Sequence, residues 1–191
     1  VLSHRIFITN ALASFLTYGA FFSWFTVGPA LLIHHMHMSS VTFGWVCLIS
    51  AAVAMSLGSL FNARFVMKLT GDRILKLGWG IMMLSGVLLG ASYLLFGNQL
   101  WAIVAMVTVM YFGATLIWPN LFSAAFTPFG HIAGYAGALY SCAQLLGGAI
   151  LATLASHLYA QNPLALASIF ILAPLCALTV KYMPQRKSKH P

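Results

Sequence analysis

Three short basic clusters divide this sequence into long, uncharged and mostly apolar stretches. Between Arg5 and Arg64 lie 58 residues without a formal charge, and between Lys76 and Lys181 lie 104. A membrane-spanning helix needs about 20 predominantly apolar residues. The first stretch therefore has room for two crossings and the second for four, so the pattern predicts an all-α membrane protein with six transmembrane helices.

Prolines, glycines and polar residues set the expected helix ends. The predicted helices cover residues 6–33, 41–61, 74–96, 100–122, 132–158 and 164–183. The predicted connections are 34–40, 62–73, 97–99, 123–131 and 159–163. Residues 1–183 are thus expected to form a six-helix transmembrane half-bundle, followed by a basic cytoplasmic tail at 184–191.

Composition and charge exclude several classes of protein. Of the 191 residues, 61% are hydrophobic and 5% are charged, whereas a soluble domain carries about 25% charged residues. This balance excludes a soluble globular domain and an intrinsically disordered chain. Nine Lys and Arg residues in three clusters are too few for a nucleic-acid-binding surface. They serve better as cytoplasmic topology signals, which predicts that both termini are cytoplasmic.

A shift of 90 residues brings similar positions of the chain into register. Gly-Trp at 44–45 falls on Gly-Tyr at 134–135. The same shift pairs Phe22 with Phe112, Pro29 with Pro119, and Gly58 with Gly148. Each unit then contains three helices, and an odd number of crossings inverts the second unit. The sequence therefore predicts a 3+3 inverted repeat, an arrangement typical of secondary transporters.

Three stretches resemble the C-terminal six helices of the major facilitator superfamily. Residues 22–29 resemble an aromatic-rich helix end closed by a proline, and 58–73 resemble the second copy of a cytoplasmic loop motif. Residues 128–139, followed by Gln144, are similar to the Bcr/CflA drug-resistance subfamily. The loop departs from the fuller motif at Asn62, where an aspartate is common, which predicts a weaker charge network there.

The resemblance implies a proton-coupled multidrug exporter in the bacterial inner membrane, working by alternating access between two six-helix halves. The expected partners are the lipid bilayer, a small lipophilic substrate and an N-terminal six-helix half, in the same polypeptide or a separate chain. We expect that the chain is not an enzyme and that it carries no cofactor. No Asp, Glu, Lys or Arg lies in the interior of a predicted helix, away from its ends, so a proton-carrying carboxylate is expected in the other half. A first residue other than Met also suggests a piece of something longer.

Polar and aromatic residues at helical spacing are candidates for the wall of a substrate cavity. Phe21 of the predicted helix 6–33 and Trp118 of the predicted helix 100–122 lie on the same helix faces as these candidates. The candidates are Asn10, Ser14, Tyr18, Phe22, Phe25, Tyr111, Thr115, Tyr140 and Gln144. Aromatic rings in such positions hold aromatic or cationic drugs. The alternative is ordinary packing, with hydroxyl groups bonded to their own helix.

Two further groups of residues are candidates for conformational roles. The hinge or gate candidates are Pro29, Pro119, Gly134 and Gly137, with passive kinks and close helix packing as the alternative. The cytoplasmic-loop candidates are Gly58, Arg64, Gly71, Asp72 and Arg73. They are expected to form an inner gate with the missing half, or to act only as a topology anchor.

Three histidines in a predicted outer loop are a weak metal-binding candidate. His34, His35 and His37 offer imidazoles within four residues, but the spacing is not that of a known site, and a polar helix cap is the alternative. No metal is expected. Two other functions stay open: a truncated or split-gene product without transport of its own, and a structural membrane subunit.

Overall fold

The computed structural model describes residues 4–66, 68–158 and 163–182, and these ranges contain helices and no strand. The α-helices are α1 (Arg5–Pro29), α2 (Ser40–Phe65), α3 (Gly71–Phe96), α4 (Leu100–Phe126), α5 (Ala133–Leu158) and α6 (Leu164–Tyr182). A π-helix, η1 (Ala30–His35), continues α1, and a 3-10 helix, η2 (Thr127–Ile132), joins α4 to α5. The prediction of an all-helical chain is confirmed.

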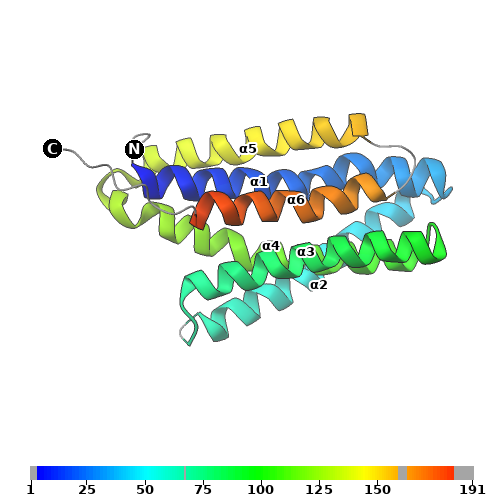
Figure 1. Ribbon diagram of the computed structural model, residues 1–191, viewed down its shortest axis with the longest axis horizontal. Helices are drawn as coiled ribbons and strands as arrows, with labels where there is room; N and C mark the ends of the chain where they lie inside the picture. Colours follow the sequence, from blue (N-terminus) through cyan, green and yellow to red (C-terminus); the bar gives the residue numbers. More distant parts are fainter. Residues whose placement is uncertain (1–3, 67, 159–162, 183–191) are drawn as a thin grey trace.

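Five helical runs in the described residues are long and apolar enough to cross a membrane, which supports the membrane class. One of them, Leu100–Leu158, contains α4, η2 and α5 without interruption. This run bends at Phe129, whose φ of −123° and ψ of 23° are not helical. Beyond the bend α5 runs back toward the opposite end of the bundle, as Figure 1 shows.

The helices pack in two layers. In the first layer α5 packs on α1, α1 on α4, and α4 on α2. In the second layer α6 covers α1, α3 covers α4, and α3 and α6 pack on each other. Figure 1 looks onto the second layer, with α6 drawn over α1. We call the other side of the first layer, which neither α3 nor α6 covers, the open face.

Glycines bring neighbouring helices close together. A Cβ atom on Gly78 of α3 would lie 2.9 Å from the carbonyl oxygen of Gly113 on α4, and a Cβ on Gly113 would lie 2.8 Å from that of Gly78. Between α1 and α5, a Cβ on Gly147 would overlap the backbone of Phe15. Close backbone approach of this kind replaces hydrophobic driving force as the source of helix association in lipid.

The main core lies between the two layers. Its largest side chains include Trp24, Trp79 and Phe170, each at most 1% exposed. Trp79 of α3 reaches α1, where its indole Nε1 donates a hydrogen bond of 3.1 Å to Oγ1 of Thr17. Buried indoles usually have such a partner, and this bond links α3 to α1.

The structure corrects the predicted ends of several helices. The helix expected over 6–33 changes to a π-helix after Pro29, because proline has no N–H to continue the α-helical pattern. The backbone N–H of Met36 then donates to Leu31, five residues earlier, at 3.1 Å. The predicted connection 62–73 shrinks to 66–70, and the predicted connection 123–131 is mostly helical. Residues 159–162 and the tail 184–191 lie outside the described residues.

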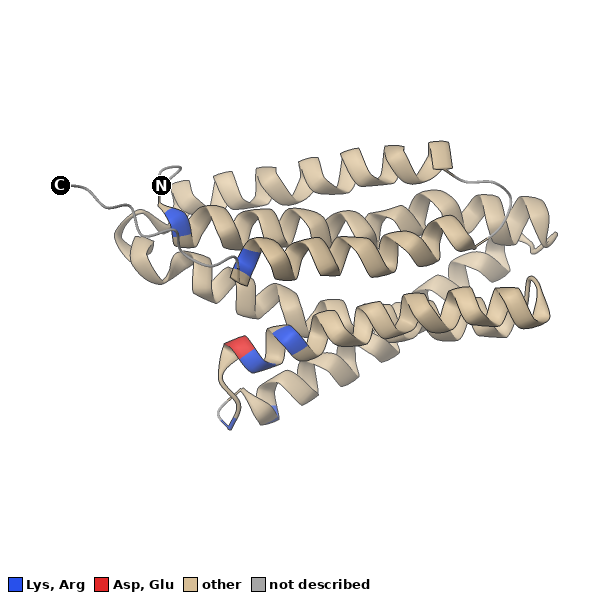
Figure 2. Ribbon diagram, in the orientation of Figure 1, with Lys and Arg blue, Asp and Glu red and all other residues tan. Residues whose placement is uncertain are grey.

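Charged residues gather at one end of the bundle, as Figure 2 shows for the described Lys, Arg, Asp and Glu side chains. This charged end contains the start of α1 at Arg5, the last turn of α2 at Arg64, and the first turn of α3 at Asp72 and Arg73. It also contains the end of α6 at Lys181. Among the described residues, the Lys and Arg side chains therefore lie at one end of the bundle, as the sequence predicts.

Candidate functional site

Six aromatic side chains of α1 and α4 meet in the middle of the first layer. We call this group the central aromatic cluster; its members are Tyr18, Phe21, Phe22, Phe25, Tyr111 and Trp118. The ring centroids of Phe21 lie 4.9 Å from Trp118 and 5.1 Å from Tyr111. Four of these residues are predicted cavity candidates. Phe21 and Trp118 are not, although Phe21 joins the two helices at the centre of the cluster.

The central aromatic cluster is only partly covered by the rest of the chain. Phe25 is 45% exposed, and Tyr18, Phe22 and Trp118 are half-buried. By contrast, Tyr111 is 1% exposed. This gradient gives the cluster a buried floor on α4 and an accessible aromatic rim on α1.

Two polar atoms in the central aromatic cluster have no hydrogen-bond partner among the described residues. They are the hydroxyl of Tyr111 and the indole Nε1 of Trp118, both buried. A buried polar group without a partner costs about 1–3 kcal/mol. Native structures keep few such groups, and water or a ligand can satisfy them. Outside this cluster, the indole Nε1 of Trp24 and the hydroxyl of Tyr140 also lack a partner among the described residues.

Ser14 and Gln144, two predicted cavity residues 130 positions apart, are joined by a hydrogen bond. The amide Nε2 of Gln144 on α5 donates to Oγ of Ser14 on α1 at 2.8 Å. Ser14 is fully buried and Gln144 is half-buried. The bond satisfies one donor of the glutamine and joins α5 to α1.

A second aromatic group closes the charged end of the first layer. We call it the end aromatic cluster, which comprises Phe7, Phe122, Phe126, Phe129 and Tyr140. The rings of Phe122 and Phe126 stack at 4.0 Å, and the ring of Tyr140 meets both edge-on at 5.7 and 5.8 Å. Tyr140 is 1% exposed, so this predicted cavity residue packs between α1, α4 and α5 and away from the central aromatic cluster.

Asn10 and Thr115 lie in packed positions. Nδ2 of Asn10 donates to the carbonyl of Ile6 at 2.6 Å, and its Oδ1 accepts a bond from Lys181. Oγ1 of Thr115 donates to the carbonyl of Tyr111 at 2.9 Å, and its methyl group lies against Gly58 of α2. These contacts favour the packing interpretation for both residues.

The four hinge or gate candidates have different surroundings. Pro29 stands where α1 changes to the π-helix η1. Pro119 lies exposed inside α4 and leaves the carbonyl of Thr115 without its helical partner. Gly134 has open space around it, whereas a Cβ on Gly137 would touch the ring of Phe126 at 3.6 Å.

The predicted loop residues belong mostly to helices. Gly58 packs inside α2, Arg64 lies in its last turn, and residues 71–73 form the first turn of α3. The structure adds Asn120 to this region: its Nδ2 donates to Oδ1 of Asn62 at 2.9 Å, and so joins α4 to α2. An asparagine directly after Pro119 in an apolar stretch was the signal that sequence analysis did not use.

The three histidines lie exposed beyond the end of α1, on the side opposite the charged end. His37 has a φ of 55°, in the left-handed region that closes this turn. Among the described residues no three His, Cys, Asp or Glu side chains come close enough to hold a metal ion. The geometry therefore gives no support to the metal alternative.

Comparison with known proteins finds similarity to a drug-resistance protein. The chain is 26% identical over 148 residues to a chloramphenicol resistance protein of Pseudomonas aeruginosa. The match covers 76% of this chain and 34% of the relative, so the chain spans about a third of the curated relative's length. No protein-family model matches the sequence. The chain is thus an all-helical membrane protein with similarity to a drug-resistance protein.

Proposed function

We propose that this chain is the C-terminal half of a secondary active drug exporter of the major facilitator superfamily, in the Bcr/CflA subfamily. In this proposal the chain is a transporter and not an enzyme, and its open face forms one wall of the substrate cavity. The observation that carries the proposal is the central aromatic cluster, with an accessible rim and two buried polar atoms that lack partners. Such a surface suits small lipophilic molecules that carry a few polar groups.

The pattern of helix contacts supports an inverted 3+3 repeat. Exchanging α1 with α4, α2 with α5 and α3 with α6 turns the contact of α1 with α5 into that of α4 with α2. It also turns the contact of α1 with α6 into that of α4 with α3, and both pairs are present. The contacts of α1 with α4 and of α3 with α6 map onto themselves.

Two glycine contacts support the repeat at the residue level. A Cβ on Gly58 of α2 would lie 3.3 Å from the carbonyl oxygen of Phe112 on α4. A Cβ on Gly148 of α5 would lie 3.2 Å from Cγ of Phe22 on α1. Both pairs of residues are related by a shift of 90 positions, the register in which the sequence repeats.

The arrangement suggests how the half works in alternating access. The end aromatic cluster seals the charged end, while the rim of the central aromatic cluster stays accessible. Opening of the charged end requires α4 and α5 to separate there, and the bend at Phe129 and the unhindered Gly134 are suited to that movement. Substrate then leaves or enters from the charged end, which we assign to the cytoplasm on its Lys and Arg content.

The proposal requires a second six-helix half. Apolar side chains on α2 and α5 are exposed, with Trp45 at 60% and Leu145 at 62%, and a partner half and the lipid bilayer would cover them. The only acidic residue of the sequence, Asp72, is exposed at the charged end. A proton carrier inside the membrane would therefore belong to the partner. The location that follows is the bacterial inner membrane.

A truncated or split-gene product without transport of its own, or a structural subunit, is the second candidate. It is favoured by the absence of a carboxylate from the interior of the helices.

Export from bacterial cells tests the proposal. The chain is expressed alone, and then together with a six-helix N-terminal half that carries an intramembrane carboxylate, taken from a related exporter. We expect chloramphenicol tolerance and export of a lipophilic cationic dye only with the partner half. Stable insertion without export in either case would contradict the proposal and favour the second candidate. Export by the chain alone would contradict the assignment of proton coupling to the partner.

A further inference from the structure

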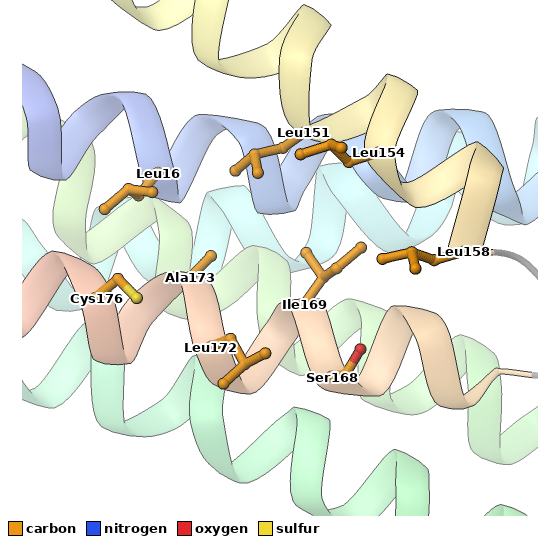
Figure 3. Close-up of a pocket in the computed structure, with 9 residues that line it drawn as sticks. All are labelled: Leu16, Leu151, Leu154, Leu158, Ser168, Ile169, Leu172, Ala173 and Cys176. Carbon is orange, nitrogen blue, oxygen red and sulfur yellow. The ribbon is translucent and has the colours of Figure 1, made fainter.

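A groove between α5 and α6 shares no residue with the two aromatic clusters. It has a volume of about 200 Å³ and is lined by Leu16, Leu151, Leu154, Leu158, Ser168, Ile169, Leu172, Ala173 and Cys176. Figure 3 shows the leucines of α5 facing Ile169 and Ala173 of α6 across it. We propose that this groove binds one acyl chain of a membrane phospholipid and holds it between α5 and α6.

The lining fits an aliphatic chain. It contains no aromatic ring. Its one hydroxyl, on Ser168, already donates to the carbonyl of Ala165 at 2.7 Å. The groove therefore offers no unsatisfied polar group to water or to a polar ligand, and an apolar space without such groups stays dry.

The dimensions fit as well. The lining residues of α6 extend from Ser168 to Cys176, about 12 Å at 1.5 Å per residue. Those of α5 extend from Leu151 to Leu158, about 10 Å on the same basis. The groove is thus elongated along the helix axes, the direction in which acyl chains lie in a bilayer. Its volume exceeds that of an apolar cavity of about 150 Å³ that holds benzene.

The packing of the surrounding helices favours a groove that is filled by a bound acyl chain. Both α5 and α6 pack extensively on α1 but touch each other only sparsely. Leu16 of α1 forms the floor, so an acyl chain in the groove touches protein on three sides. An empty groove would deprive the side chains that line it of dispersion attraction, which a bound acyl chain restores. Because Leu154, Leu158 and Leu172 are each exposed at the groove, a lipid chain can enter directly from the bilayer.

Photo-crosslinking in vesicles tests the inference, and it does not depend on transport. The chain is reconstituted in phosphatidylethanolamine and phosphatidylglycerol, doped with phosphatidylethanolamine that carries a diazirine in the middle of one acyl chain. Crosslinks are mapped by peptide mass spectrometry. We expect several-fold enrichment at 151–158 and 168–176 over residues 48–57 of α2, whose Leu48, Ile49 and Leu57 are 55–59% exposed, within the 49–61% range of the rim leucines of the groove. Equal labelling of the two surfaces would overturn the proposal.

Variants in which a larger side chain fills the groove provide a second test. In Ala173→Phe the new ring occupies the groove, and labelling of 151–158 is expected to fall to the level of the α2 segment. Cys176→Phe is the companion variant, because Cys176 is exposed at the rim and a larger side chain there leaves the core unchanged. Undiminished labelling in a folded variant of either kind would overturn the proposal. Ala52→Phe, on the exposed side of α2, is the matched control and should leave the pattern as it is.

Discussion

The ammonium group of Lys181 lies 2.6 Å from Oδ1 of Asn10, so the last turn of α6 is bonded to the start of α1. Lys181 is half-buried, whereas the other described Lys and Arg residues are exposed. The next residue, Tyr182, continues the connection to α3: the ammonium group of Lys76 lies 4.6 Å from the centre of its ring. Three helices that are distant in sequence are thus tied together at the charged end.

Replacing Lys181 with methionine should destabilise the chain. A hydrogen bond to a charged group contributes about 1.5–3 kcal/mol, and methionine keeps the apolar stem while removing the donor. We expect a lower midpoint of thermal unfolding in detergent. The control is Lys68→Met, which changes an exposed lysine near the same end.

A double-mutant cycle with Asn10→Ala separates the bond itself from other effects. The two single changes should together cost more than the double mutant, because each one already breaks the same bond. Strict additivity of the losses would show that Lys181 and Asn10 act independently, against the geometry.

The bond between Asn62 and Asn120 should be important for the packing of α2 on α4. In Asn62→Leu, Nδ2 of Asn120 loses its partner across the helix pair and keeps only the carbonyl of Leu116, 2.8 Å away. A lost hydrogen bond of this type costs about 1 kcal/mol. Thermal unfolding should detect the loss, whereas Ala63→Leu on the adjacent exposed position should have no effect. An identical midpoint for both variants would contradict the role of this bond.

Charge spacing predicted several of the helix ends. Lys and Arg are excluded from lipid, and Arg5, Arg64 and Lys181 lie in the first or last turn of α1, α2 and α6, whereas Lys76 lies in the second turn of α3. The exact helix ends were less predictable, because a helix extends past the membrane as long as no residue stops it. For this reason α2 and α4 run further than expected, to Phe65 and Phe126.

The partners of the candidate residues could not be predicted from sequence periodicity. The spacing of Ser14 and of Gln144 places each on a polar helix face, but their hydrogen bond depends on how α1 and α5 cross. In the same way, sequence spacing places Asn10 among the cavity residues. Its bond with Lys181 depends on the tertiary fold, which brings the end of α6 to the start of α1. Tyr140 likewise shares a helix face with Gln144 but lies in the end aromatic cluster.

Gly147 should tolerate no side chain. Its Cβ would overlap the backbone of Phe15, and backbone cannot move aside as the end of a flexible side chain can. Gly147→Val should therefore separate α5 from α1 and cost at least the 1–3 kcal/mol typical of overpacking. Gly134→Val is the control on the same helix, since nothing lies within 4 Å of a Cβ there. The measurement is the yield of monodisperse protein together with its unfolding midpoint.

Gln144→Leu and Tyr18→Ala should lower drug export by the reassembled transporter while leaving expression unchanged. The first change removes the half-buried amide that is bonded to Ser14, and the second removes a ring of the accessible rim. Resistance and dye export in cells are the measurements. Leu84→Ala, an exposed position on α3 in the second layer, is the control. Unchanged export in both variants would remove the open face from the substrate pathway.

Tyr111→Phe should raise stability and lower export at the same time. The hydroxyl of Tyr111 is buried without a partner, so its removal should stabilise the chain by about 1 kcal/mol, the lower end of the cost of such a group. If the hydroxyl binds substrate, the same change weakens export of a substrate with a hydrogen-bonding group. The two effects have opposite signs, so a folding defect cannot imitate the result. Tyr135→Phe, 64% exposed on α5, is the matched control and should change neither property. A gain in stability with unchanged export would mean that Tyr111 packs the cluster without contacting substrate.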